Sequence, residues 1–106
     1  MRKIFIAQAG AGTTAAAFTL AWALRAEGRF EKAPVAVEMG VPSKSLKAQF
    51  RAADGWGADW LILVGEEELK RGTVILKDLR RHSQEEVPLA EATPTLLTRI
   101  AVEPLP

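Results

Sequence analysis

The segment SLKAQFRAADGWGADWLILVGEEEL, residues 45–69, decides the fold of this chain. Its first half has the apolar spacing of a helix that starts at Ser43 or Ser45 and lasts to about Trp56, where a glycine follows. The next run, residues 60–64, is apolar throughout, which is typical of a strand with helices over both faces of its sheet. A helix followed by such a strand indicates an α/β fold with a largely buried sheet.

The sequence on either side continues this alternation. The expected strands are short runs that end at glycine, proline or polar turns, and they cover residues 3–7, 35–38, 60–64, 73–78 and 85–88. The expected helices are residues 13–27 before Gly28, 43–56, the single turn 66–71, and a segment within 89–102 that starts late, at Thr93 and Pro94. Two strand–helix–strand crossovers followed by a hairpin predict one α/β domain over residues 1–106, with a mixed five-stranded sheet and helices on both faces.

Aromatic residues are expected where the helices pack on the sheet. Phe18 and Trp22 lie one turn apart, so we expect them on the packing side of the first long helix. Trp56 and Trp60 are likewise expected to pack rather than to stack on bases.

Composition limits the classes of function. The formal charge of this 106-residue chain is +1, so nucleic-acid binding would need a local cluster of Lys and Arg rather than an overall positive field. The chain has no cysteine and a single histidine, His82, which excludes disulfides, thiolate metal sites and histidine-rich metal sites. Polar residues and glycines interrupt the N-terminal apolar run, so we expect neither a signal peptide nor a membrane span and predict a cytoplasmic protein.

A basic stripe lies on the helix of the deciding segment. Lys44, Lys47 and Arg51 fall within a sector of about 60° when residues are placed at about 100° per position, and the apolar residues fall opposite. If the apolar side packs on the sheet, the three cations project together into solvent. They can then hold phosphates, or they can form a plain solvated face.

The loops after the first three strands should meet at one edge of the sheet, where open α/β sheets bind ligands. The basic helix begins at this edge, so its free N–H groups and Lys44 could face an anion. Gly65 would allow close approach to the backbone, and a carboxylate just beyond it suits the two N–H donors of a guanine edge. Of the three consecutive acids, residues 66–68, at least one is expected to be only solvated.

A dinucleotide site is the rival interpretation of this edge. The run GAGTTA at residues 10–15 matches G-x-G-x-x-A after a first strand, and Glu38 ends the second strand. Against this, the chain is too short for a second mononucleotide half, and the first crossover is longer than usual. No catalytic constellation is present, because His82 lies in an expected surface turn beside Arg80 and Arg81.

Several segments resemble the anticodon-binding domain of histidyl-tRNA synthetases, over roughly residues 3–92. The matching pieces are LRAEG, VAVE, SLKAQ, Gly57-Ala58, GEEEL, GTVILKDL and EVPL, of which those within 45–58 and 65–79 are the most specific. The resemblance implies a three-layer α/β/α fold with sheet order 2-1-3-4-5 and an antiparallel fourth strand. It also implies that anticodon bases are unstacked and read at the sheet edge.

The resemblance also assigns roles to residues. Glu68 matches the acid of the family's Gly-x-x-Glu element, Lys77 the cation of the fourth strand, and Lys47 and Arg51 the basic helix residues. The RNA-binding site is therefore expected to comprise Lys44, Lys47, Arg51, Gly65, Glu68 and Lys77, without metal or cofactor. The expected partners are a tRNA with a histidine-type anticodon and either a synthetase catalytic domain or a second copy. Because no catalytic domain lies in these residues, the chain is expected to be non-catalytic alone.

The sequence departs from the family pattern around this edge. The loop 41–44 and the connection 30–34 are lengthened, and residues 8–10 read Gln-Ala-Gly where the family usually has Pro-Leu-Gly. The alternative is a free-standing synthetase relative that acts as a protein–protein or regulatory module without reading tRNA.

Overall fold

The computed structural model describes residues 1–30 and 34–102, so part of the lengthened connection 30–34 lies outside the described residues. The strands are β1 (Arg2–Ala9), β2 (Val35–Met39), β3 (Trp60–Gly65), β4 (Thr73–Asp78) and β5 (Ser83–Pro88). The helices are α1 (Thr14–Phe30), α2 (Leu46–Trp56), α3 (Glu66–Lys70) and α4 (Ala92–Val102), with a 3₁₀ turn, η1 (Leu89–Glu91), before α4.

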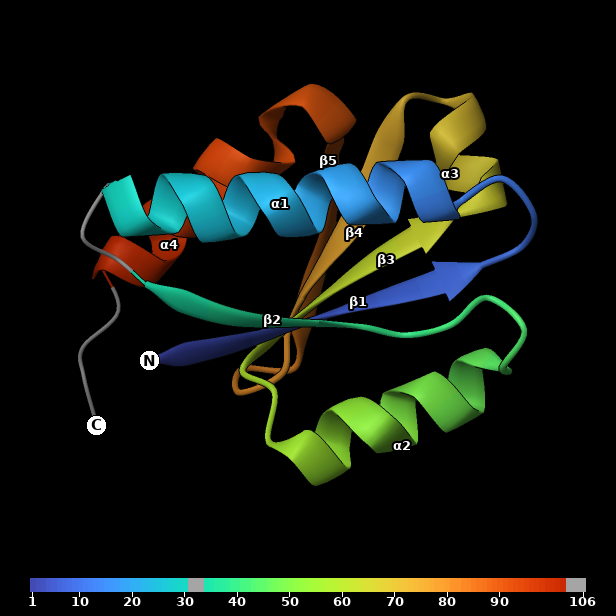
Figure 1. The fold of residues 1–106 in the computed structure, drawn as a ribbon, viewed down its shortest axis with the longest axis horizontal. Coiled ribbons are helices and arrows are strands. Elements are labelled where there is room, and N and C mark those ends of the chain that lie inside the picture. Colours follow the sequence, from blue (N-terminus) through green and yellow to red (C-terminus); the bar gives the residue numbers. More distant parts are fainter. Residues whose placement is uncertain (31–33, 103–106) are drawn as a thin grey trace.

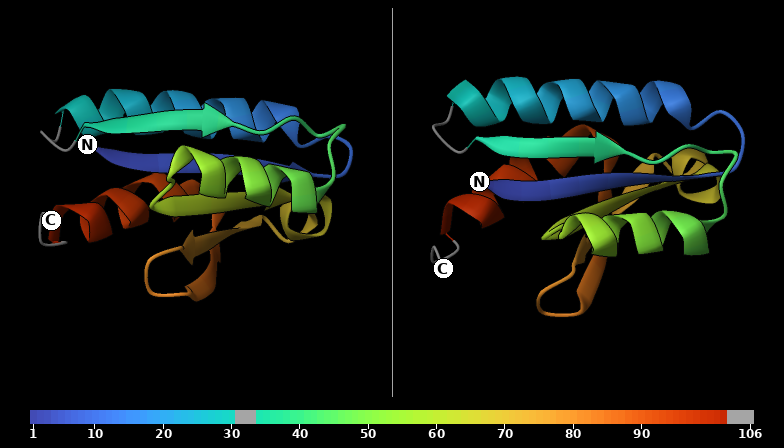
Figure 2. Two further views of the ribbon diagram at one scale, coloured as in Figure 1. Left: turned by 90° about the horizontal axis from the view of Figure 1, so that it is seen from below. Right: turned by 60° about the horizontal axis from the view of Figure 1, so that its bottom comes forward.

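The five strands form one mixed sheet in the order β2-β1-β3-β4-β5. β1 pairs in parallel with β2 and β3, whereas β4 is antiparallel to both β3 and β5. Helices α1 and α4 lie on one face and α2 lies alone on the other (Figures 1 and 2). The predicted three-layer α/β/α fold, with its strand order and antiparallel fourth strand, is confirmed.

Side-chain alternation along the central strands feeds two separate cores. Ile4, Ile6 and Ile62, each 0% exposed, pack with α1 and α4. Phe5 and Leu61 point the other way, into a smaller cluster beneath α2. The near-continuous apolar runs of these strands therefore arise from coverage on both faces.

The orientation predicted for α1 was wrong. Phe18 and Trp22 are each 66% exposed, and the helix packs instead through Ala17, Leu20, Ala21 and Leu24. Apolar residues surround this helix on most sides, so the sequence spacing alone did not choose a face. Two alanines on the packing face let the helix backbone approach the sheet closely.

Two helix boundaries also differ from the prediction. α1 continues through Gly28, which is buried, to Phe30; a glycine inside a helix costs about 1 kcal/mol relative to alanine, and tertiary packing can offset it. α4 starts at Ala92 rather than at Thr93, which places Pro94 in its first turn, where a missing N–H is tolerated. Trp60, 3% exposed, is in the core as expected.

A pair of substitutions on α1 tests the corrected orientation. Leu24→Ala should lower the free energy of unfolding by about 2–5 kcal/mol, because it leaves a cavity in the core. Phe18→Ala should change it by less than about 0.5 kcal/mol, because that side chain faces solvent. Urea denaturation of both variants measures the difference, and equal losses would contradict the orientation described here.

Candidate nucleic-acid interface

The carboxyl ends of the three parallel strands meet at one edge of the sheet. Ala9 of β1 lies opposite Gly65 of β3, and Gly40, just after β2, donates its N–H to Ile6 O at 2.8 Å. Helix α2 begins at this edge, where the Ser45 hydroxyl accepts the N–H of Ala48 at 3.1 Å. Of the two caps predicted, Ser45 is therefore the N-cap.

Lys44, Lys47 and Arg51, which we call the α2 cations, are all exposed. Lys47 and Arg51 are one turn apart on α2, whereas Lys44 precedes the cap and lies in the turn that enters the helix. None of the three forms an ion pair within the described residues. Asp54 is the only acid of α2 and lies near its last turn.

Lys77 lies beside α2 rather than at the sheet edge. Its Nζ is 4.7 Å from the centroid of the Phe50 ring, a cation–π contact. Because β4 runs away from the edge, about 14 Å of strand separates Lys77 from Thr73, which contacts Glu68. The predicted site residues therefore fall into two groups. The α2 cations and Lys77 lie along the flank of α2, whereas Gly65 and Glu68 lie where β3 ends.

Glu68 forms the edge group with Gly65. Its side chain is 19% exposed and folds back over Gly65, so that a Cβ at position 65 would overlap Glu68 Oε1. Its Oε2 accepts from Arg71 at 3.4 Å. The space over Gly65, where close approach of a ligand was expected, is thus occupied by the Glu68 carboxylate, which this glycine accommodates.

Arg71 connects Glu68 to β5. Its Nε donates to Glu86 Oε2 at 3.0 Å, and the Thr73 hydroxyl donates to the same carboxylate oxygen. The hydrogen bond from Arg71, and to a smaller extent the one from Thr73, lowers the pKa of Glu86 below its ordinary value of 4.5. The same Arg71–Glu86 contact raises the pKa of Arg71 above its ordinary value, so the guanidinium stays charged beside Glu68.

The other two acids of α3 have different surroundings. Glu67 is exposed and pairs with Lys70 at 3.4 Å. Glu66 lies against Gly10, where an added Cβ would be 2.5 Å from its Oε2. Gly10 follows β1 and Glu66 follows β3, so this contact lies at the end of the β1–β3 pair. In a sheet with the strand order β2-β1-β3, the phosphates of a dinucleotide would bind at this point. A carboxylate there repels phosphate, which argues against the dinucleotide interpretation.

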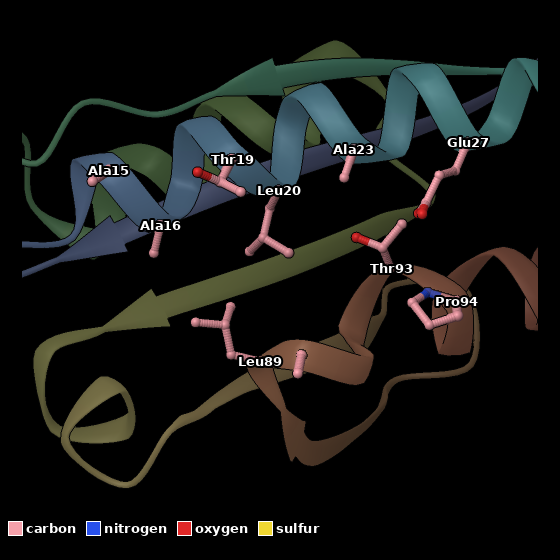
Figure 3. A pocket seen from close by; sticks show the side chains of 10 residues that line it. Ala15, Ala16, Thr19, Leu20, Ala23, Glu27, Leu89, Thr93 and Pro94 are labelled. Atoms are coloured by element: carbon pink, nitrogen blue, oxygen red, sulfur yellow. The ribbon is translucent and has the colours of Figure 1, made fainter.

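A groove on the opposite side of the sheet does not suit a polyanion. It encloses about 430 Å³ between α1 on one side and η1 with the first turn of α4 on the other (Figure 3). The described residues of its lining are mostly Ala, Thr, Leu and Pro, and Glu27 is the charged residue among them. Among the described residues no group of three or more His, Cys, Asp or Glu side chains could hold a metal ion. None of the helices in this described part of the chain is long and apolar enough to cross a membrane.

Two buried glutamines at the edge were not identified as site residues from the sequence. Gln8 and Gln49 are each 2% exposed, and the side-chain amide of Gln49 hydrogen-bonds to both the N–H and the carbonyl of Gln8. The available signal was a polar residue at the end of an apolar strand. In the sequence, Gln8 interrupts the N-terminal apolar run and begins the Gln-Ala-Gly segment that departs from the family pattern.

Comparison with known proteins gives a consistent result. A family model described as "Anticodon binding domain" matches residues 3–99. The chain is 37% identical over 86 residues to a histidine–tRNA ligase of Dehalococcoides mccartyi, covering 81% of this chain and 19% of that relative. It is 38% identical over 100 residues to the corresponding ligase of Sorangium cellulosum, covering 94% of this chain and 22% of the relative. It thus spans about a fifth of the length of the curated relatives it matches.

A solved structure supports the same fold. The histidyl-tRNA synthetase of Nostoc sp. PCC 7120 superposes with a TM-score of 0.77 at 23% identity, covering 93% of this chain and 22% of that one. At this level of identity the match bears on the fold alone.

Glu86→Gln should destabilise the fold at neutral pH, with an effect that fades on acidification. Because the pKa of Glu86 is lowered in the folded chain, its carboxylate stabilises the fold above pH 4.5, and this contribution is lost as the pH falls through the lowered value. Thermal unfolding of both chains from about pH 7 to about pH 3 measures the trend. A difference in midpoint that stays constant with pH would contradict it.

Proposed function

The chain belongs to the anticodon-binding domain family, of the histidyl-tRNA synthetase type, and from this premise we propose that it binds tRNA at the anticodon loop. The α2 cations would hold phosphates, and Glu68 would read a base edge at the end of the sheet. Lys77 would contact a base or phosphate along the flank of α2.

One observation carries this proposal: among the residues that the structure describes, the exposed α2 cations have no acidic partner, while Glu68 at the edge is held in place by its neighbours. Phosphate binding needs cations that are free to exchange counterions for phosphates. Base reading needs an acceptor whose orientation is set before the ligand arrives. Glu68 meets this need, because Gly65 and Arg71 confine its carboxylate from two sides.

The position of Lys77 shapes the expected binding mode. With Lys77 against Phe50, the positive surface extends from Lys44 at the sheet edge down the flank of α2. A single-stranded loop could run along this flank and place one unstacked base at Glu68. Phe50 is already covered by a cation on one side, so we do not assign it a stacking role.

The wider assignments follow from the relatives. We propose that the tRNA carries a histidine-type anticodon, because the relatives described above are histidine–tRNA ligases. We also propose that this chain does not activate an amino acid by itself and cooperates with a synthetase catalytic domain, in the cytoplasm. Specific binding to an anticodon loop would separate this function from a protein–protein module, which predicts no RNA binding.

Lys47→Gln should weaken tRNA binding and reduce its salt dependence. Losing one phosphate contact should lower the slope of log Kd against log salt by about 1. Fluorescence titrations with an anticodon stem-loop over a salt series measure this slope. Arg29→Gln, which removes an exposed cation from α1 on the other face, is the matched control and should leave the slope unchanged. Absence of binding by the unaltered chain would reject the function.

Glu68→Gln should instead reduce discrimination between anticodons. Loss of one bidentate acceptor should decrease the preference for a histidine over an anticodon-swapped stem-loop by about 1–3 kcal/mol. Gly65→Ala should act in the same direction, because its Cβ would displace the carboxylate without removing it. Glu67→Gln, an exposed acid one residue away, is the control. Equal discrimination in the Glu68 and Glu67 variants would show that the acid is misassigned.

A further inference from the structure

Strand β2 leaves the sheet before β1 ends. The last pair between them is Ile6 with Met39, whereas β1 continues beside β3 to Ala9. The carbonyl of Ile6 faces β2, because it accepts the N–H of Gly40 at 2.8 Å. By the alternation of a strand, the N–H and C=O of Gln8 point the same way and have no β2 residue to pair with. Gln8 is 2% exposed, so water does not readily satisfy these groups.

The side-chain amide of Gln49 takes the place of the missing strand. Its Oε1 accepts the N–H of Gln8 at 2.8 Å, and its Nε2 donates to the carbonyl of Gln8 at 2.7 Å. The second hydrogen of Nε2 goes to the carbonyl of Lys44, at 2.9 Å. Gly40 provides the room, since a Cβ there would overlap Gln49 Oε1. One side chain thus joins the end of β1 to the turn before α2.

The side chain of Gln8 completes the arrangement. Its Nε2 donates to the carbonyl of Gly40 at 2.7 Å, and its Oε1 accepts from the Thr13 hydroxyl at 3.2 Å. The two amides therefore hold together the loop after β1, the loop after β2 and the entrance to α2. These loops carry the edge at which the proposed function places the RNA.

We propose that Gln49 is a positioning residue for RNA binding, which fixes the Lys44 turn to the sheet so that its cation is placed before the ligand arrives. This role rests on the proposed function. The main chain of Lys44 is held on both sides, because its N–H donates to Val41 O at 3.1 Å and its carbonyl accepts from Gln49.

The chemistry of an amide is essential to this role. Gln49 donates two hydrogen bonds and accepts one, a combination that neither a carboxylate nor an apolar side chain can supply. A turn that is ordered in the free protein loses less conformational entropy on binding, which raises affinity without adding a contact. Loss of Gln49 should therefore weaken binding without changing the number of phosphates held.

The experiment compares Gln49→Met with the unaltered chain. Methionine has similar length and no charge, so it removes the three hydrogen bonds while leaving every cation in place. We expect faster hydrogen exchange at the Lys44 amide, and anticodon stem-loop affinity lower by about 3- to 10-fold with an unchanged salt slope. Gly40→Ala, which pushes the Gln49 amide away from Gln8, should give the same pattern and serves if Gln49→Met does not fold.

The control is Leu97→Ala, a core truncation in α4 on the opposite face of the sheet. Measured at a temperature where all variants are folded, it should leave RNA affinity unchanged. An equal affinity loss in Leu97→Ala, or unchanged affinity in both edge variants while the unaltered chain binds, would overturn the positioning role and leave the proposed function standing. Failure of the unaltered chain to bind RNA would overturn both.

Discussion

Covering both faces of the central strands is the constraint from which the arrangement of the molecule follows. β1 and β3 send apolar side chains to both sides of the sheet, so each face needs a helix. The crossovers from β1 to β2 and from β2 to β3 share one hand, and β2 and β3 lie on opposite sides of β1. The connecting helices therefore fall on opposite faces. Helix α2 is alone on its face, with its apolar side against Phe5 and Leu61 and its cations left to solvent.

The three acids at the start of α3 show that backbone position decides what a carboxylate can do. They are consecutive in the sequence, yet Glu66 lies against Gly10, Glu67 pairs with Lys70 in solvent, and Glu68 folds onto Gly65. A helix turns each successive residue by about 100°, so neighbours cannot share an environment. A Gly-x-x-Glu spacing returns the acid to the side of its glycine, which is the geometry seen here.

Much of the fold could be predicted from the sequence because local signals agreed with tertiary packing. Ser45 and Gly57 bound α2 as expected, and the apolar run of β3 is buried as expected. The face of α1 could not be predicted, because Phe18, Trp22, Leu20 and Leu24 all have helical spacing and only contact with the sheet selects among them. The roles of Gln8 and Gln49 were also hidden, since they depend on where β2 ends relative to β1.

The distribution of charge explains how a chain with a formal charge of +1 can present a site for RNA. Arg71, Arg80, Arg81 and Arg99 each pair with an acid on the sheet or on its connections. These pairs neutralise the β4, β5 and α4 side of the molecule and use acids that would otherwise oppose a phosphate. The α2 cations have no such partner among the described ion pairs, so no neighbouring acid offsets their charge. Net charge is the sum of all charges on the surface, whereas a polyanion responds to a local excess of positive charge. In this domain one such local excess is formed by the α2 cations, beside the edge at which we propose that a base is read.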